Sequence, residues 1–361
     1  MIRSWTAALA LILLAFGTTA KAEPYFAVRQ GLKCVACHVN PTGGGMRNAF
    51  GTTWSQRILP AQTVDTGGFD WTGAIADHIS LGGNLRAGFT YVDVPHEDST
   101  SEFNVDEARV YLLFEPIPQR LQIYVDELVA PGSADNREAW AMLWFGNQSF
   151  YLKAGQFYLP FGLRLEDDTA YVRQVPGINM TTPDRGVELG WETVHWSAQL
   201  AISNGTAGSA ETDNGKQVTA KAEYVASAWR AGLSGSFNDT DAGDRTLGGV
   251  FAGLRTGPVA WLAEADYVTD DSVQESGRDS WVGLLEANWS FAPGQNLKFT
   301  AEYFEPDVDI DQDEQNRWSI VWEYVPMQFV QVRAGVRSYD GIPQNDLQNR
   351  ALAFLQLNAY F

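Results

Sequence analysis

Cysteine and histidine are scarce in this sequence, which has two cysteines and four histidines among its 361 residues. Two cysteines cannot form the disulfide framework that holds many small exported proteins together. Both lie in one short stretch, as Cys34 and Cys37, so we expect them to act as a pair. The histidines are scattered, and no motif joins them to a serine and an acid, so the sequence does not indicate a hydrolase.

Basic residues and long apolar runs are also in short supply. Acidic residues outnumber basic ones by 44 to 25, and the formal net charge of −19 argues against a nucleic-acid partner and favours cations. After the N-terminal region, no window holds the roughly 20 uninterrupted apolar residues that a membrane-spanning helix requires. Glycine and aromatic residues are plentiful instead, with 34 Gly, 13 Trp, 13 Tyr and 19 Phe, and this composition suits an outer-membrane barrel.

The N-terminal region has the pattern of a secretory signal peptide. Arg3 precedes an apolar stretch from Ala7 to Phe16, and the small-residue triplet Ala20-Lys21-Ala22 follows it. We therefore predict a signal peptide over residues 1–22, cleaved after Ala22. The apolar stretch is too short to span a bilayer as a retained helix, so we expect an exported protein.

Cys34, Cys37 and His38 form a Cys-x-x-Cys-His motif. This spacing places two thiols on one short turn for thioether bonds to the haem vinyl groups, and the adjacent imidazole ligates the iron. The alternatives are a redox-active dithiol or reducible disulfide, which lacks a thioredoxin-like βαβ context, and half of a zinc site, which lacks a second ligand pair. We predict one covalent haem c. The glycine run over residues 43–45 would either pack closely against the haem or serve as a flexible loop.

The stretch from Phe26 to His38, followed by Pro41, Asn48 and Phe50-Gly51, resembles the N-terminal cytochrome segment of the fused monohaem cytochrome-porins of iron-oxidising bacteria. The resemblance implies a short haem segment at or in an outer-membrane barrel, and electrons taken from extracellular ferrous iron. It rests on a small part of the chain. The glycine run over residues 43–45 departs from that family's pattern.

From Asp77 onward, the sequence breaks into segments of about ten residues in which apolar and polar side chains alternate. In one such segment Trp229 and Leu233 would share the lipid face, while Arg230 would face a wet lumen. Tight turns alternate with longer acidic loops, as periplasmic turns and external loops do in outer-membrane barrels. The final segment ends on Phe361 and resembles the aromatic-ended last strand that outer-membrane assembly machinery recognises.

We therefore predict an all-β fold: an antiparallel outer-membrane β-barrel of about 16 strands over residues 71–361, with a short, partly helical c-type haem-binding segment over residues 23–70. An even number of strands leaves both chain ends on the periplasmic side, so the haem segment is expected there or inside the barrel. The alternative is a soluble periplasmic β-sandwich. Loop lengths, aromatic strand ends and Phe361 favour the barrel.

The predicted lumen face carries charges of both signs, which suits a filled interior better than a strongly selective pore. Its members are Arg86, Lys153, Glu188, Lys221, Glu223, Glu264, Asp266, Glu302, Arg333 and Arg337.

His38 is the predicted proximal ligand of the haem iron, and the sixth ligand position has several candidates. Met46 is nearest in sequence, and His78 and His195 fall on the inferred lumen face near periplasmic strand ends. His96 falls in a predicted external loop. Each of these residues also has an ordinary interpretation, as packing, lumen wall or solvated surface, and an iron without a protein ligand at this position is a further alternative.

Together these features predict an electron-transfer protein of the bacterial outer membrane. It would pass electrons between an extracellular donor or acceptor, with Fe²⁺ as the best guess, and a periplasmic c-type cytochrome. The alternative is a diffusion porin for small solutes whose haem segment is a plug or a periplasmic tether. We expect the acidic external loops to be solvated or bridged to lipopolysaccharide by divalent ions, since the stretch 307–318 lacks the glycine and the closing glutamate of an EF-hand.

Overall fold

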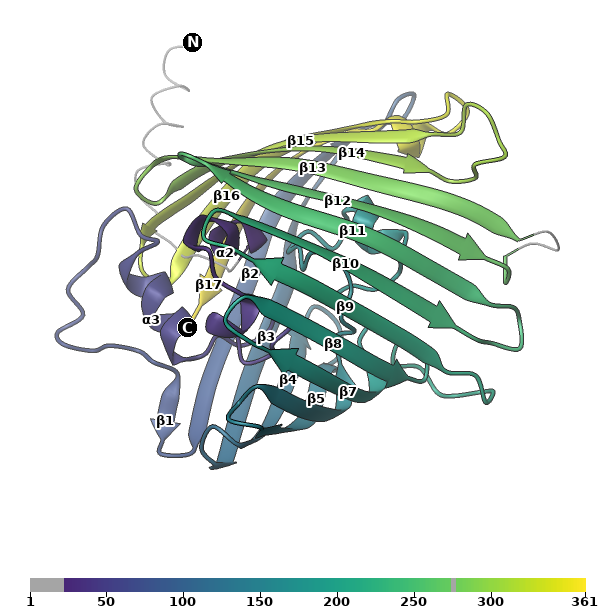
Figure 1. The fold of residues 1–361 in the computed structure, drawn as a ribbon. Coiled ribbons are helices and arrows are strands. Elements are labelled where there is room, and N and C mark those ends of the chain that lie inside the picture. Colours follow the sequence, from purple (N-terminus) through teal and green to yellow (C-terminus); the bar gives the residue numbers. More distant parts are fainter. Residues whose placement is uncertain (1–22, 274–276) are drawn as a thin grey trace, which may run out of the picture.

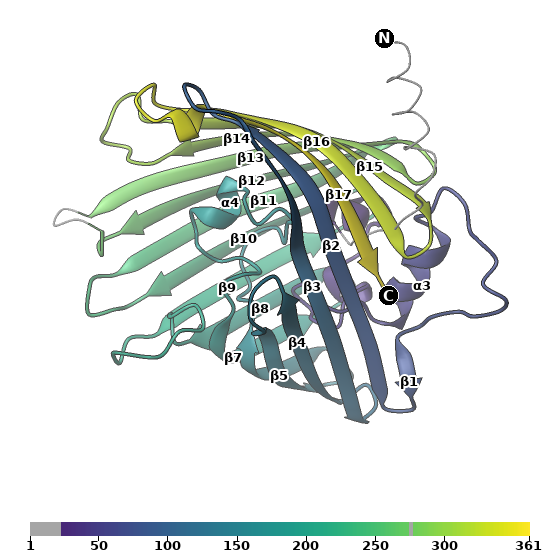
Figure 2. The same cartoon turned by 180° about the vertical axis from the view of Figure 1, so that it is seen from behind.

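The computed structural model describes residues 23–273 and 277–361, and the predicted signal peptide lies outside them. Sixteen long strands, β2 to β17, each pair antiparallel with the next, and β17 pairs back onto β2 (Figures 1 and 2). The sheet therefore closes into a barrel, and the prediction of an antiparallel barrel of about 16 strands is confirmed. The three-residue β1 adds a short pairing on β2.

The strand bounds are β1 (Ala74–Ala76), β2 (Ile79–Asp93), β3 (Thr100–Ile117), β4 (Leu121–Ala130), β5 (Asp135–Phe145), β6 (Phe150–Phe157), β7 (Asp184–Glu192), β8 (Trp196–Ser203), β9 (Gln217–Val225), β10 (Trp229–Asn238), β11 (Arg245–Thr256), β12 (Val259–Asp270), β13 (Arg278–Ala292), β14 (Gln295–Glu305), β15 (Gln315–Met327), β16 (Val330–Asp340) and β17 (Ala351–Tyr360).

Alternation of side chains gives the barrel an apolar outside and a polar inside. On β10, Leu233 is 60% exposed, whereas Arg230 is 3% exposed. Because successive strand residues point to opposite faces, this pattern repeats around the barrel and the predicted faces are confirmed. Outward apolar residues include Leu85, Leu112, Ile123, Leu143, Leu152, Leu189, Ile202, Val250, Leu285, Ile320, Val336 and Leu355.

Exposed aromatic residues gather near both ends of the strands, as in the interfacial belts of membrane proteins. Next to the short turns they include Trp191, Trp196, Trp229 and Trp289, and next to the long loops they include Tyr91, Tyr267, Trp281 and Trp318.

Short turns and long loops alternate along the chain and lie at opposite ends of the barrel. Strand pairs such as β11 and β12 are joined by two residues, Gly257 and Pro258, whereas β8 and β9 are joined by residues 204–216. The loop between β16 and β17 carries the helical turn η2 (Asp346–Asn349). In outer-membrane barrels the short turns face the periplasm, and this convention orients the protein here.

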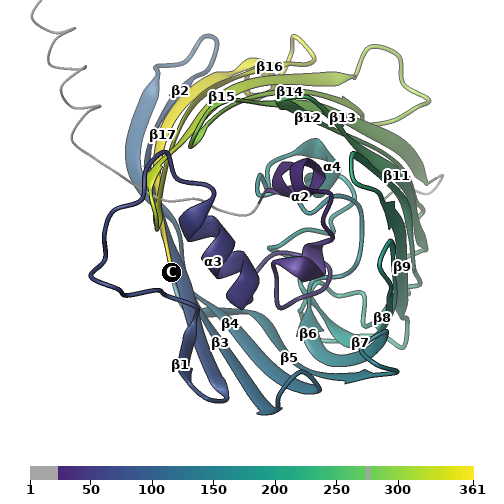
Figure 3. The same cartoon turned by 60° about the vertical axis from the view of Figure 1, so that its left-hand side comes forward.

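Two segments of chain fill much of the interior (Figure 3). The N-terminal segment contains α2 (Pro24–Gln30), η1 (Cys34–Ala36) and α3 (Ala49–Arg57), and it enters from the end that carries the short turns. The inward loop, residues 158–183 between β6 and β7, carries α4 (Tyr171–Gln174) and is largely buried. The filled interior agrees with the mixed charges of the predicted lumen face.

No helix among the described residues is long and apolar enough to cross a membrane.

Candidate functional site

The Cys-x-x-Cys-His motif lies on one tight turn inside the barrel. Helix α2 starts with Pro24 in its first turn and ends at Gly31, whose left-handed backbone (φ 63°) lets the chain reverse towards the motif. In η1, the backbone N–H groups of Cys37 and His38 both donate to the Cys34 carbonyl oxygen, at 3.1 and 3.0 Å. These bonds bring the two thiols and the imidazole onto one short piece of backbone.

Asn48 ties the motif to helix α3. Its side-chain oxygen accepts from the Gly51 N–H at 2.9 Å, which caps the helix, and its amide nitrogen donates to the carbonyls of Val35 and Ala36 at 3.2 and 3.1 Å. The Asn48 backbone N–H also donates to the Cys37 carbonyl, at 3.0 Å. One side chain therefore fixes the start of α3 against the motif.

The N-terminal segment is bonded to the barrel wall at several points. Lys33 pairs with Glu192 at 2.5 Å, and Asn40 donates to Glu138 at 2.6 Å. Tyr25 donates to Glu323 at 2.8 Å. Because these partners sit on β5, β7 and β15, the segment is held from several sides of the barrel.

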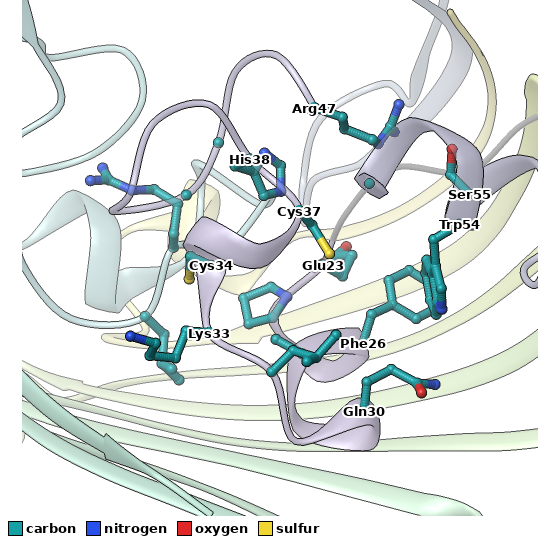
Figure 4. Close-up of a pocket in the computed structure, with 18 of the residues that line it drawn as sticks. Glu23, Phe26, Gln30, Lys33, Cys34, Cys37, His38, Arg47, Trp54 and Ser55 are labelled. Carbon is teal, nitrogen blue, oxygen red and sulfur yellow. The ribbon is translucent and has the colours of Figure 1, made fainter. Parts of the chain in front are cut away.

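A largely apolar cavity opens beside the motif (Figure 4). Cys34, Cys37 and His38 line it, Phe26 and Trp54 line it from the two helices, and the two rings meet edge to face at 5.6 Å. The other lining residues are Glu23, Pro24, Ala27, Gln30, Leu32, Lys33, Gly43, Gly44, Arg47, Gly51, Ser55, Leu59, Leu163, Arg164, Lys221 and Arg230.

Burial sets the protonation of the motif. It lowers the pKa of His38 to about 4, with the nearby Arg47 adding to the effect, so the imidazole is neutral and able to ligate a metal. Burial, together with the neighbouring Cys34, raises the pKa of Cys37 to about 11, so this thiol stays protonated.

The glycine run is packed rather than free. Gly43, Gly44 and Gly45 all adopt positive φ, and a side chain at Gly43 would lie 3.3 Å from the Cys34 sulfur. At Gly45 it would lie 2.6 Å from the Tyr124 hydroxyl. The loop therefore passes close to both the motif and the barrel wall, which favours the close-packing interpretation over a flexible linker.

None of the predicted candidates for the sixth iron position lines the cavity. The Met46 side chain is buried against the barrel wall, where its atoms would lie within 3.5 Å of a side chain at Gly73 or Gly82. His78 and His195 lie in short turns at the periplasmic end, where each ring meets a backbone carbonyl oxygen at 2.9 Å.

Both of these histidines are exposed at the rim of the barrel. The carbonyl oxygens of His78 and His195 accept from the backbone N–H groups of Glu115 and Val225, so each histidine continues the pairing of its strand and keeps the parity of the lumen-facing residues. His96 is exposed in an external loop, as predicted, and lies 3.2 Å from Asp346.

Met180 was not among the candidates from the sequence. It lies on the inward loop and lines a second cavity, which is also lined by His38 and Gly44. Its sulfur would lie 3.2 Å from a side chain at Gly44. No motif marks Met180, because its position depends on how the inward loop folds back into the barrel.

Among residues 23–273 and 277–361, no group of three or more histidine, cysteine, aspartate or glutamate side chains is arranged to hold a metal ion.

Known structures with a similar fold are porins. The anion-selective porin from Comamonas acidovorans superimposes with a TM-score of 0.63 at 12% sequence identity, covering 78% of this chain and 99% of that one. A loop L8 deletion mutant of the Vibrio cholerae outer membrane protein OmpT gives a TM-score of 0.61 at 12% identity, with 78% and 99% coverage. Pseudomonas putida OprB gives 0.61 at 9% identity, with 79% and 94% coverage.

The fold is that of an outer-membrane porin. The identities are too low to carry more than the fold to this chain. No family model and no curated protein matches the sequence. The porin fold, with its closed sheet and apolar exterior, supports a location in the bacterial outer membrane, and the soluble β-sandwich alternative is wrong.

Proposed function

We propose that this protein is an electron-transfer protein of the outer membrane that carries one covalent haem c on Cys34 and Cys37. The observation that carries the proposal is a Cys-x-x-Cys-His turn facing a largely apolar cavity inside a porin-fold barrel. His38 would be the proximal ligand of the haem iron. The proposed partners are a periplasmic c-type cytochrome and an extracellular redox partner, with Fe²⁺ as the leading donor.

The residues beside the motif suit a flat, largely apolar group. Phe26, Trp54 and Leu163 offer apolar surface to the cavity, and the packed glycine loop offers backbone without side chains. The Nδ1 atom of His38 is buried and has no hydrogen-bond partner among the described residues. A histidine that ligates a metal usually donates the N–H of its other ring nitrogen to a nearby acceptor. The backbone of Gly44, Gly45 and Met46 lies close to the His38 ring.

When bound, haem c supplies a one-electron redox couple whose potential depends on axial ligation, charge and burial. The chain would contribute the remaining requirements. The barrel wall and the inward loop would limit the access of water, the aromatic rings would hold the flat group in place, and the acidic external loops would attract cations.

Helix α3 offers a surface to a periplasmic partner. It lies at the opening of the barrel that carries the short turns (Figure 1), and Phe50 and Ile58 are 52% and 61% exposed. Both residues lie close in sequence to the cavity residues Gly51 and Leu59. Exposed apolar side chains beside a redox site are the type of contact that a transient electron-transfer complex uses.

The decisive test uses purified protein in liposomes with a c-type cytochrome trapped inside. We expect external Fe²⁺ to reduce the internal cytochrome, and a Cys34→Ser/Cys37→Ser variant in the same membrane to lose both this activity and the haem stain after denaturing electrophoresis. A wild-type protein without haem stain would refute the proposal. Haem without transfer in either direction would refute the electron-transfer role.

A diffusion porin is the second candidate, and the fold comparisons support it more directly, because the similar structures are porins. In that case the N-terminal segment would act as a plug or tether. Large, stable single-channel conductance that rises when the anchoring contacts of the segment are removed, with no dependence on Cys34 and Cys37, would favour this function.

A further inference from the structure

Two buried cations beside the motif lack the paired carboxylate that the other buried cations inside the barrel have. The described part of the chain contains nine buried basic residues. Seven of them pair with a carboxylate: Arg109, Lys153, Arg173, Arg230, Lys298, Arg317 and Arg333. The remaining two, Arg164 and Lys221, form no ion pair with any described residue, and both line the cavity beside Cys34.

Arg164 is 8% exposed and only partly bonded. Its Nη2 atom donates to the Leu159 carbonyl at 2.9 Å and to the Thr42 hydroxyl at 3.3 Å, while its Nε and Nη1 atoms are buried without a partner. Lys221 is 6% exposed and donates to the Gly162 carbonyl at 2.6 Å. Glu138 and Glu223 are the nearest charged carboxylates, but both lie beyond ion-pair distance. A buried charge without a direct counter-ion is costly, so a fold that retains two of them at one cavity indicates an anionic occupant.

The two cations approach the cavity from different parts of the molecule. Arg164 comes from the inward loop and lies against the glycine run, where its side chain would be 3.8 Å from one at Gly43. Lys221 comes from β9 and lies over the Phe251 ring at 4.8 Å. Burial, with the nearby Arg173, lowers the pKa of Arg164, and Glu138 offsets this effect only in part.

The geometry points to a site for carboxylates formed by Arg164 and Lys221. Under the proposed function, on which this inference rests, these carboxylates are the two propionates of the tethered haem. Arginine and lysine both bind carboxylates through charge-assisted hydrogen bonds, and two cations match the two negative charges. The apolar side chains would contact the porphyrin face. The thioethers to Cys34 and Cys37 would fix one edge of the ring, and Arg164 and Lys221 would bind the propionates of the opposite edge.

The test compares Arg164→Met, Lys221→Met and the double variant with wild type. Removing a positive charge beside the haem disfavours the reduced state, so we expect each variant to retain haem stain and to lower the midpoint potential. For the double variant we expect at least a tenfold change in the reduction equilibrium, which is 59 mV for a one-electron couple. Arg164→Lys should restore most of the wild-type value. Arg120→Met is the matched control, since it removes an exposed charge from the short β3–β4 turn.

A second measurement separates anion binding from a purely structural role. In the Cys34→Ser/Cys37→Ser background Arg164 has no anion to neutralise, so Arg164→Met should raise the urea midpoint, whereas in the haem-bearing protein it should lower it.

A change of the same sign in both backgrounds would overturn the inference, and so would a potential that moves no further than in Arg120→Met. Either result leaves the haem stain, and hence the proposed function, intact. Absence of haem from wild type would overturn both.

Discussion

Gly51 shows how closely two parts of the N-terminal segment approach each other. It occupies the first turn of α3, and a side chain there would overlap the carbonyl oxygen of Cys37. The Asn48 cap brings the helix to this position. The backbone of Gly51 does not adopt a positive φ. A glycine is needed here because the two backbones touch and leave no room for a side chain.

We predict that Gly51→Ala displaces α3 from the motif. The expected cost is about 1–3 kcal/mol of stability, as for overpacking of a close contact, together with reduced haem attachment. Urea unfolding and the haem-to-protein ratio would measure these effects. Gly248→Ala is the control, because that position has open space around it. Equal behaviour of the two variants would show that α3 can move freely.

At the scale of single elements, Asp167 connects the inward loop to two strands of the barrel wall. It pairs with Arg337 on β16 at 2.5 Å and with Arg317 on β15 at 3.1 Å. Burial alone would raise the pKa of Asp167, but the two guanidiniums outweigh burial and hold this pKa well below its ordinary value. A depressed carboxyl pKa contributes stability that is present above the ordinary pKa and is lost as the pH falls below about 4.

We predict that Asp167→Asn lowers the free energy of unfolding at pH 7 by about 1.5–3 kcal/mol. The variant should also lose part of the destabilisation that wild type shows on acidification below about pH 4. Unfolding midpoints recorded from pH 3 to pH 8 would test both effects. Asp135→Asn, in an exposed pair with Arg137, should change little. If the unfolding midpoint of Asp167→Asn depended on pH as that of wild type does, Asp167 would not be a source of the acid sensitivity.

The strands could be predicted because their signal is local. Trp229 and Leu233 alternate with Arg230 along one strand, so a short stretch of sequence contains its own evidence. The inward loop could not be recognised in this way. Apolar residues such as Phe161 and Leu163 resemble strand residues, yet β6 ends at Phe157 and they fill the lumen.

Within the candidate site, too, some residues could be predicted from local sequence and others could not. The spacing of Cys34, Cys37 and His38 identified the motif and predicted its chemistry without any structure. By contrast, Arg164 and Lys221 are 57 positions apart in sequence, and only the closed barrel brings them to one cavity. Met180 was missed for the same reason.

At the scale of the whole molecule, closure depends on the seam between β17 and β2. Beyond the last paired residues, Phe361 and Gly83 exchange backbone hydrogen bonds at 3.0 and 3.2 Å. The Phe361 ring also lies 5.8 Å from that of Trp71. The C-terminal residue therefore fastens the final strand to the first long one and covers the linker from the N-terminal segment.

We predict that deletion of Phe361 lowers the yield of folded barrel and destabilises it by about 1–3 kcal/mol, because both hydrogen bonds and the ring contact are lost. The fraction of protein that migrates in the compact form on unheated gels would measure folding. Phe361→Tyr should fold normally. If the truncated chain matched wild type, the seam would not need its last residue.

The position of the motif within the closed sheet has a consequence for the order of biogenesis. An enzyme that forms thioethers needs unhindered access to both sulfurs, and in the finished molecule these sulfurs lie inside a cylinder whose wall touches the same segment. If haem is attached, the attachment must come while β17 is still separate from β2, so maturation in the periplasm would precede insertion. The folded barrel would then enclose a prosthetic group that could not have been added afterwards.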